Sequence, residues 1–122
     1  MESIAIVDDD INLCTVLSEE LNDVGFETSY LSNGENVVEY VKDKNPDLVL
    51  LDLKIPGTDG LDVLKEISYH PRIKTKVIVI TACADERSAI QSAKLGAQDF
   101  ICKPYDFSEL LSSIRRVLQK ET

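Results

Sequence analysis

The chain has 122 residues, 43% hydrophobic and 29% charged, a composition typical of one globular domain rather than a disordered segment. Its formal net charge of −9 disfavours duplex DNA or an anionic membrane as the main partner. No apolar run approaches the roughly 20 residues that span a bilayer, and no secretion signal is visible, so we expect one cytoplasmic domain over residues 1–122.

The first strand and helix are indicated by two apolar patterns near the amino terminus. The run Ile4–Val7 is wholly apolar, which predicts a strand buried on both faces. Apolar residues then recur at Leu13, Leu17 and Leu21 with helical spacing, and Asp10 can cap that helix. We therefore expect these three leucines to form the stripe that packs on the core.

The same alternation of strand and helix continues to the carboxyl terminus. The later predicted elements are an edge strand at 26–30, a helix around 37–41, a strand at 48–51, a helix around 61–67, a strand at 77–80, a helix over 85–95 with few large apolar groups, a strand at 100–102 and a helix around 110–118. Five strand–helix units with right-handed crossovers predict an α/β fold of the (βα)5 type. This is a doubly wound, flavodoxin-like, five-stranded parallel sheet in the order 2-1-3-4-5.

The cysteines show no pattern of a disulfide framework or a zinc site. They are Cys14, Cys83 and Cys102, an odd number, set among apolar residues. We expect reduced thiols in a reducing compartment.

Polar side chains follow four of the predicted strands at the point where each strand ends. Asp8 and Asp9 follow the first strand, Asp52 the third, Thr81 the fourth and Lys103 the fifth. The carboxyl ends of parallel strands meet at one edge of the sheet, where open α/β folds bind ligands. We therefore expect three carboxylates, one hydroxyl and one ammonium in a single place.

These residues carry a resemblance to a known family. The chain resembles, over its whole length, the receiver domain of two-component response regulators, of the stand-alone or phosphorelay type. The matching motifs are Asp8-Asp9, residues 52–60 (DLKIPGTDG), Thr81-Ala82 and Lys103-Pro104, each at a strand end. The resemblance implies that Asp52 accepts a phosphoryl group from a sensor histidine kinase or a histidine phosphotransfer protein.

The resemblance also implies a cation site. Asp9, Asp52 and the backbone carbonyl of Lys54 would bind Mg²⁺ directly, with Mn²⁺ as a substitute, and Asp8 would support the ion partly through water. Hard oxygen ligands without His or Cys agree with this choice of metal. By the same resemblance Lys103 and the hydroxyl of Thr81 would contact the phosphoryl oxygens.

Three other functions deserve comparison. A magnesium-dependent phosphatase of the haloacid dehalogenase type needs a second acid two residues after the nucleophile, where this chain has Lys54. A flavin-binding domain needs a phosphate loop after the first strand, where the acids at 8–10 would repel phosphate. A receiver that only docks, without phosphorylation, is disfavoured because all five key residues are present. Magnesium-dependent labelling by acetyl phosphate separates these functions.

We further predict a partner surface on the first helix and the loop after the fifth strand. It would receive the kinase and consists of Ile11, Cys14, Thr15, Ser18, Pro104 and Tyr105. We expect a downstream protein target, no direct nucleic-acid contact and no membrane insertion. If the sequence is complete, the chain is a stand-alone regulator or a relay intermediate.

The switch and the lifetime of the phosphorylated form are predicted from four positions. Thr81 and Phe100, with the apolar-poor helix over 85–95, would change on phosphorylation. Lys54 and Cys83 flank the predicted path of the hydrolytic water and are poor proton acceptors. We therefore expect slow autodephosphorylation and a phosphoacceptor rather than a turnover enzyme.

Overall fold

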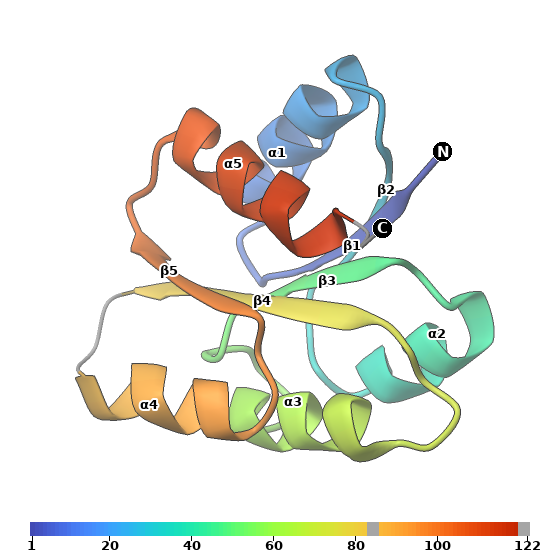
Figure 1. Cartoon of the computed structure of the whole chain (residues 1–122), viewed down its shortest axis with the longest axis vertical. Coiled ribbons are helices and arrows are strands. Elements are labelled where there is room, and N and C mark those ends of the chain that lie inside the picture. The colour runs from blue at the N-terminus through green and yellow to red at the C-terminus, as the bar shows by residue number, and fades with distance from the viewer. Residues whose placement is uncertain (83–85, 120–122) are drawn as a thin grey trace.

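A single parallel sheet with helices on both faces forms the body of the molecule (Figure 1). The computed structural model describes residues 1–82 and 86–119. Its elements in chain order are β1 (Ser3–Val7), α1 (Ile11–Asp23), β2 (Glu27–Leu31), α2 (Val37–Lys44), β3 (Leu48–Leu51), α3 (Gly60–Tyr69), β4 (Lys76–Ala82), α4 (Glu86–Lys94), β5 (Asp99–Lys103) and α5 (Phe107–Leu118). The five strands are all parallel and follow the order β2-β1-β3-β4-β5, which confirms the predicted fold class.

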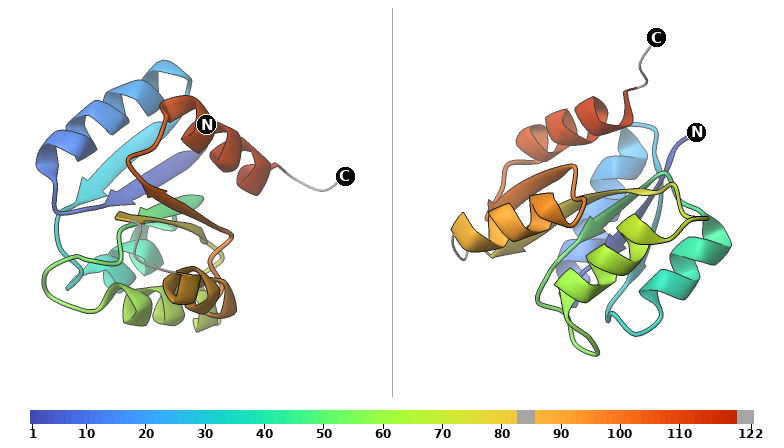
Figure 2. Two further views of the ribbon diagram at one scale, coloured as in Figure 1. Left: turned by 90° about the vertical axis from the view of Figure 1, so that its left-hand side faces the viewer. Right: turned by 60° about the horizontal axis from the view of Figure 1, so that its bottom comes forward.

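The helices divide into two layers. Figure 1 shows α1 and α5 on one face of the sheet and α2, α3 and α4 on the other, and Figure 2 shows the same layers from two further directions. Each central strand must therefore be apolar on both faces, which is why β1, β3 and β4 each contain an uninterrupted apolar run of four residues. Among the described helices, none is long and apolar enough to cross a bilayer.

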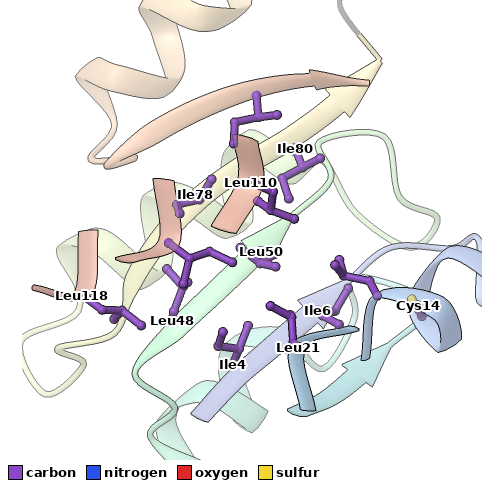
Figure 3. Close-up of a cluster of buried hydrophobic side chains, with 13 residues drawn as sticks. Ile4, Ile6, Cys14, Leu21, Leu48, Leu50, Ile78, Ile80, Leu110 and Leu118 are labelled. Atoms are coloured by element: carbon purple, nitrogen blue, oxygen red, sulfur yellow. The ribbon is translucent and has the colours of Figure 1, made fainter. Parts of the chain in front are cut away.

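Alternate strand residues feed two separate hydrophobic cores. Ile6, Leu50 and Ile78 point toward α1 and α5, where the core shown in Figure 3 is completed by Leu21, Leu110 and others. The intervening residues, such as Val49 and Val79, point to the opposite core under α2 and α3. This period of two fixes which side chains of each strand can reach the site at the strand ends.

The boundaries of α1 agree with the predicted caps. The Asp10 carboxylate accepts a hydrogen bond from the Leu13 backbone N–H at 3.1 Å, so it satisfies one of the free donors of the first turn. The chain leaves the helix through Gly25, whose φ of +103° lies in the left-handed region that glycine tolerates.

The inward face of α1 includes a residue that the predicted stripe of leucines omitted. Cys14, Leu17 and Leu21 are its buried residues, whereas Leu13 is only partly buried. Residues 14, 17 and 21 are spaced by three and four, which keeps them on the line facing the sheet, whereas a row spaced strictly by four drifts off that line. Leu13 does pack against the core, as predicted, but at its margin, and the fully buried Cys14 joins Leu17 and Leu21 at its centre.

The fourth helix, α4, buries a small polar residue. Its buried residue is Ser92, while Ile90 is 52% exposed and Ala93 faces solvent. Among the described residues, Ser92 Oγ has no hydrogen-bond partner. The helix therefore packs through a small polar residue, which agrees with the prediction that it buries little apolar surface.

Candidate functional site

The sheet register brings the ends of β1 and β3 together. Val7 pairs with Leu51, so Asp8 and Asp52 are the next residues on neighbouring strands, and the Asp52 N–H donates to the Val7 carbonyl at 2.9 Å. Asp8 is 3% exposed and Asp52 is 6% exposed. Two acids are thus held almost out of solvent at the carboxyl edge of the sheet.

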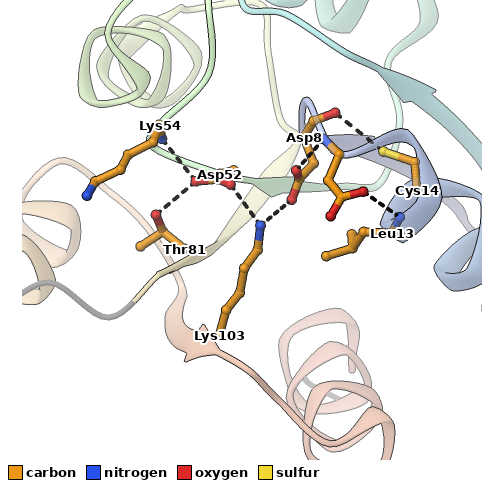
Figure 4. A network of polar contacts seen from close by, with 8 residues as sticks. Asp8, Leu13, Cys14, Asp52, Lys54, Thr81 and Lys103 are labelled. Atoms are coloured by element: carbon orange, nitrogen blue, oxygen red, sulfur yellow. Dashed lines mark hydrogen bonds and ion pairs between the residues drawn. The ribbon is translucent and has the colours of Figure 1, made fainter.

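Lys103 is the cation that these buried acids share. Its Nζ lies 2.6 Å from Asp8 Oδ2 and 2.9 Å from Asp52 Oδ2, reaching across from the end of β5 (Figure 4). Burial would lower the pKa of Lys103, but its hydrogen bonds to both carboxylates outweigh that effect and raise the pKa. The ammonium therefore stays charged at neutral pH and neutralises part of the acidic site.

The second oxygen of Asp52 is also fully engaged. Oδ1 accepts hydrogen bonds from Thr81 Oγ1 at 2.8 Å and from the Lys54 backbone N–H at 2.9 Å. Thr81 is itself 2% exposed, so its hydroxyl is aimed into the site rather than at solvent. The carboxylate is consequently fixed by three different donors from three chain segments.

The first loop holds a third acid beside this pair. Asp8 Oδ1 accepts from the Asp10 N–H at 2.9 Å, which folds the loop back on itself and leaves Asp9 exposed. Carboxylate oxygens of Asp8, Asp9 and Asp52 lie within 4.8 Å of one another. Three acids with one lysine leave an excess of negative charge, and this all-oxygen donor set fits a hard divalent cation.

Cys14 proves to support this loop rather than to face a partner. Its side chain is fully buried, and the thiol donates to the Asp8 carbonyl oxygen at 3.4 Å. Burial and the neighbouring acids Asp8 and Asp10 raise the pKa of Cys14 to about 11, so the thiol stays protonated. The prediction that Cys14 lies on the docking surface is wrong, because its position on α1 points into the core.

The rest of the predicted partner surface is divided between two flanks of α1. Ile11, Thr15 and Ser18 share the flank of Asn22, whose side chain accepts a hydrogen bond from Thr28 of β2. Ile11 is 48% exposed, Thr15 is exposed and Ser18 is half-buried.

The loop after β5 meets the other flank of α1. Tyr105 and Leu13 both pack against the core beneath α1 and α5, while Pro104 is exposed. Burial and the charge of Glu20 raise the pKa of Tyr105 to about 12. The six predicted residues therefore do not form one continuous surface.

The remaining predicted positions have mixed outcomes. Phe100 is half-buried and packs against the core beneath α2 and α3, so its switching role stays a prediction. Lys54 is exposed, and Figure 4 shows its side chain extending away from the Asp52 carboxylate. Cys83 lies outside the described residues. Cys102 is disulfide-bonded, which corrects the expectation that every cysteine is reduced.

Some site contacts had no clear sequence signal. The N–H groups of Asp10 and Lys54 close short turns onto the acids two residues before them. An aspartate followed closely by a turn is the only sequence signal for a hydrogen bond from a backbone N–H to the carboxylate two residues earlier. The thiol contact of Cys14 depends on the rotation of α1, which apolar spacing did not resolve.

Comparisons with known proteins agree with this geometry. Residues 4–115 match the family model of the response regulator receiver domain. The chain is 38% identical over 119 residues to the regulatory protein AtoC of Escherichia coli, covering 98% of this chain and 26% of that protein. It is 36% identical over 117 residues to the sporulation initiation phosphotransferase F of Bacillus subtilis, covering 96% of this chain and 94% of that protein.

A solved structure shows the same fold. The signal receiver domain of a Luxo repressor protein from Vibrio parahaemolyticus superposes with a TM-score of 0.90 at 28% identity, covering 96% of this chain and 89% of that one. The matched relatives differ in length, and the chain spans about a quarter of AtoC and 48% of the regulator BaeR of Escherichia coli. The family match, the strand order and the acids at the strand ends show that this chain belongs to the response regulator receiver domains of two-component systems.

Proposed function

We propose that Asp52 accepts a phosphoryl group and that a bound Mg²⁺ is required for the transfer. Receiver domains are phosphorylated by histidine kinases or phosphotransfer proteins, and the family match supports the same role here. The observation that carries the assignment is the position of Asp52. Its carboxylate is nearly buried and is contacted at once by a hydroxyl, an ammonium and a backbone N–H.

In the proposed step, a carboxylate oxygen of Asp52 attacks the phosphorus of a phosphohistidine. The new O–P bond forms as the P–N bond breaks, and the imidazole nitrogen keeps the electron pair and then takes a proton. Attack requires Asp52 to release some of its present partners, and Lys103 and Thr81 are close enough to follow the oxygens of the incoming phosphoryl group.

The cation would be held by Asp8, Asp9 and Asp52 together with the backbone carbonyl of Lys54. When bound, Mg²⁺ supplies positive charge to the phosphoryl oxygens. Mn²⁺ would substitute for it. The chain's own contribution is to keep the acids together, through the loop turn at Asp10 and the counter-ion Lys103.

Labelling with acetyl phosphate tests the assignment. Wild-type protein with Mg²⁺ should gain one phosphoryl group by intact-mass measurement, and Asp52→Asn should gain none, because an amide cannot form the acyl phosphate. Asp10→Asn is the matched control. Like Asp52→Asn, it removes one carboxylate charge, but in the loop between β1 and α1. Asparagine can still cap α1, so labelling should persist. A stable label on the Asp52→Asn variant would refute the choice of nucleophile.

We infer that the kinase docks on the flank of α1 that faces the loop after β5. Val16 is 56% exposed, and helical geometry places it nearer to Leu13 and Glu20 than to Thr15. With Pro104 and Tyr105 this flank offers a partly apolar surface on a strongly acidic protein. Val16→Glu should slow phosphoryl transfer from a histidine kinase and leave acetyl phosphate labelling unchanged.

A charge on the opposite flank provides the control for docking. Thr15→Glu introduces the same carboxylate on the side that faces β2, and transfer from the kinase should be retained. Loss of transfer with Thr15→Glu but not with Val16→Glu would place the kinase on the originally predicted flank. Equal loss of labelling with both donors would refute a docking role for the mutated residue.

We also propose that the phosphorylated form is long-lived and that the chain acts as a phosphoacceptor rather than a turnover enzyme. Lys54, two residues after Asp52, carries no group that can accept a proton from a hydrolytic water at neutral pH. Lys54→Asn should therefore shorten the lifetime, as measured by release of phosphate from purified phosphorylated protein. Equal lifetimes for the variant and wild type would remove Lys54 from the explanation.

A further inference from the structure

The loop between β2 and α2 packs tightly on the loop that carries Lys54. In both views of Figure 2 the loop after β2 and the loop after β3 run side by side. The Gly34 N–H donates to the Pro56 carbonyl at 2.9 Å, and the Glu35 N–H donates to the Asn33 side chain at 2.9 Å. Gly34 is buried, although it belongs to a polar turn, SNGEN, at 32–36.

Gly34 has no room for a side chain. A Cβ at this position would lie 2.4 Å from Thr58 Cγ2 and 2.7 Å from Ile55 Cδ1, both on the loop after β3. Gly57 faces back in the same way, since its Cβ would lie 2.7 Å from Glu35 Cγ. The two loops therefore interlock through glycines that each leave space for the other loop's side chains.

The contact bears on the site because Ile55 directly follows Lys54. Ile55 is 7% exposed and belongs to the core beneath α2 and α3, so it has little freedom to move away from an added methyl group. The carbonyl of Lys54 is part of the peptide that joins these two residues. A displacement of Ile55 thus turns or shifts that carbonyl relative to Asp52.

We propose that Gly34 is a positioning residue for the cation site, because it sets the place of the Lys54 carbonyl through Ile55 and Thr58. This inference rests on the proposed cation ligands, and it extends the site to a loop that contributes no ligand itself. Substitution of residues that orient metal ligands commonly weakens metal binding by roughly 10- to 100-fold. We expect Gly34→Ala to weaken Mn²⁺ binding about tenfold, toward the lower end of that range.

The experiment measures Mn²⁺ affinity by electron paramagnetic resonance of the free ion, without any phosphoryl donor. Gly34→Ala should bind Mn²⁺ more weakly than wild type. Adding Thr58→Ser and Ile55→Val removes the two methyl carbons that the new Cβ would strike, so the triple variant should recover the affinity. A double variant with Thr58→Ser and Ile55→Val alone, with Gly34 retained, shows what those changes do without the clash.

Gly25→Ala is the control for the general loss of stability that a glycine-to-alanine change can cause. Gly25 has a φ of +103° and no atom within 4 Å of an added Cβ, so alanine there strains the backbone far from the loop pair. Its Mn²⁺ affinity should equal that of wild type. A loss of affinity as large as that of Gly34→Ala would show that general destabilisation is the cause and would overturn the proposal.

A second measurement separates this proposal from the cation site itself. Amide chemical shifts of Lys54 and Ile55, recorded without divalent cations, should move in Gly34→Ala and return in the triple variant. Unchanged amide shifts or an unchanged Mn²⁺ affinity in Gly34→Ala would overturn the positioning role. A triple variant that still binds Mn²⁺ as weakly as Gly34→Ala would overturn it as well. If Asp9→Ala leaves Mn²⁺ affinity unchanged, the proposed ligands fail instead, and the amide shifts then decide whether Gly34 positions the loop.

Discussion

Replacing Lys103 with methionine tests whether this lysine is the internal counter-ion of the acidic site. Its ammonium contacts Asp8 at 2.6 Å and Asp52 at 2.9 Å, while the lysine side chain is only 21% exposed. Methionine keeps much of the aliphatic stem and removes the charge. Loss of one partner from a buried ion pair costs about 3–5 kcal/mol. Because Lys103 keeps some contact with solvent, we expect Lys103→Met to lower the free energy of unfolding by about 3 kcal/mol, the lower end of that range.

Urea unfolding followed by circular dichroism, without divalent cations, measures this loss. In thermal unfolding, the midpoint temperature of Lys103→Met should also be lower than that of wild type by roughly 10 °C for a domain of this size. Mg²⁺ should restore most of the stability of Lys103→Met, because an ion that binds only the native state adds to its stability. The gain with Mg²⁺ should be larger than in wild type, where the lysine already neutralises part of the charge.

Lys42→Met is the control for the charge change. Lys42 pairs with Glu39 at 3.4 Å on the exposed surface of α2, and such pairs contribute about 0.3–0.5 kcal/mol. Mg²⁺ should stabilise the Lys42→Met variant no more than it stabilises wild type. The counter-ion role is refuted if Lys103→Met loses no more stability than Lys42→Met, or if Mg²⁺ stabilises Lys103→Met no more than wild type.

Four further substitutions, the last of them a control for the third, test separate features of the packing. The raised pKa of Cys14 means that its thiol contributes stability below pH 9.0, which is lost as the pH rises to about 11. Wild type should therefore lose about 2–3 kcal/mol more than Cys14→Ser across that window in urea unfolding, and parallel pH profiles would contradict this. Gly60→Ala should cost about 2–3 kcal/mol in thermal unfolding, because its Cβ would lie 2.4 Å from Leu53 Cα, and an unchanged melting temperature would argue against the close approach. Ser92→Ala should raise the unfolding free energy by about 1 kcal/mol, because it removes a buried hydroxyl without a partner among the described residues. The hydroxyl of Ser113 donates a hydrogen bond to Asp99, so Ser113→Ala should lower the unfolding free energy by about the same amount. A lower unfolding free energy in both variants would mean that the Ser92 hydroxyl does have a hydrogen-bond partner.

Much of the fold followed from the sequence because the central strands are buried on both faces. A parallel strand covered by helices on each side must be apolar throughout, and Leu48–Leu51 has that form between two turn signals. The acid after such a strand then falls at the carboxyl edge of the sheet. Asp52 and its neighbours could therefore be placed from the sequence alone, with the strand order expected of a doubly wound, flavodoxin-like sheet.

The details of α1 and α4 could not be predicted, because both depend on helix rotation. In α1 apolar residues occur on several sides, so Leu13 and Cys14 were both compatible with an inward face. In α4 the apolar residues are few, and a buried serine leaves no hydrophobic signal. The contact of Gly34 with the loop after β3 joins residues that are not close in sequence, and a single turn glycine does not show what it faces.

The ion pair between Lys103 and Asp8 joins residues 95 positions apart, so it has a consequence for how the chain folds. A chain that has been synthesised only through β4 already contains Asp8, Asp9 and Asp52 but lacks the lysine that neutralises two of them. Such a nascent chain would bring carboxylates together without an internal cation, so dissolved divalent ions would stabilise its partly formed sheet more than they stabilise the finished domain. The acidic edge therefore becomes electrostatically complete only when β5, the last strand, docks against β4 and brings Lys103 to the acids.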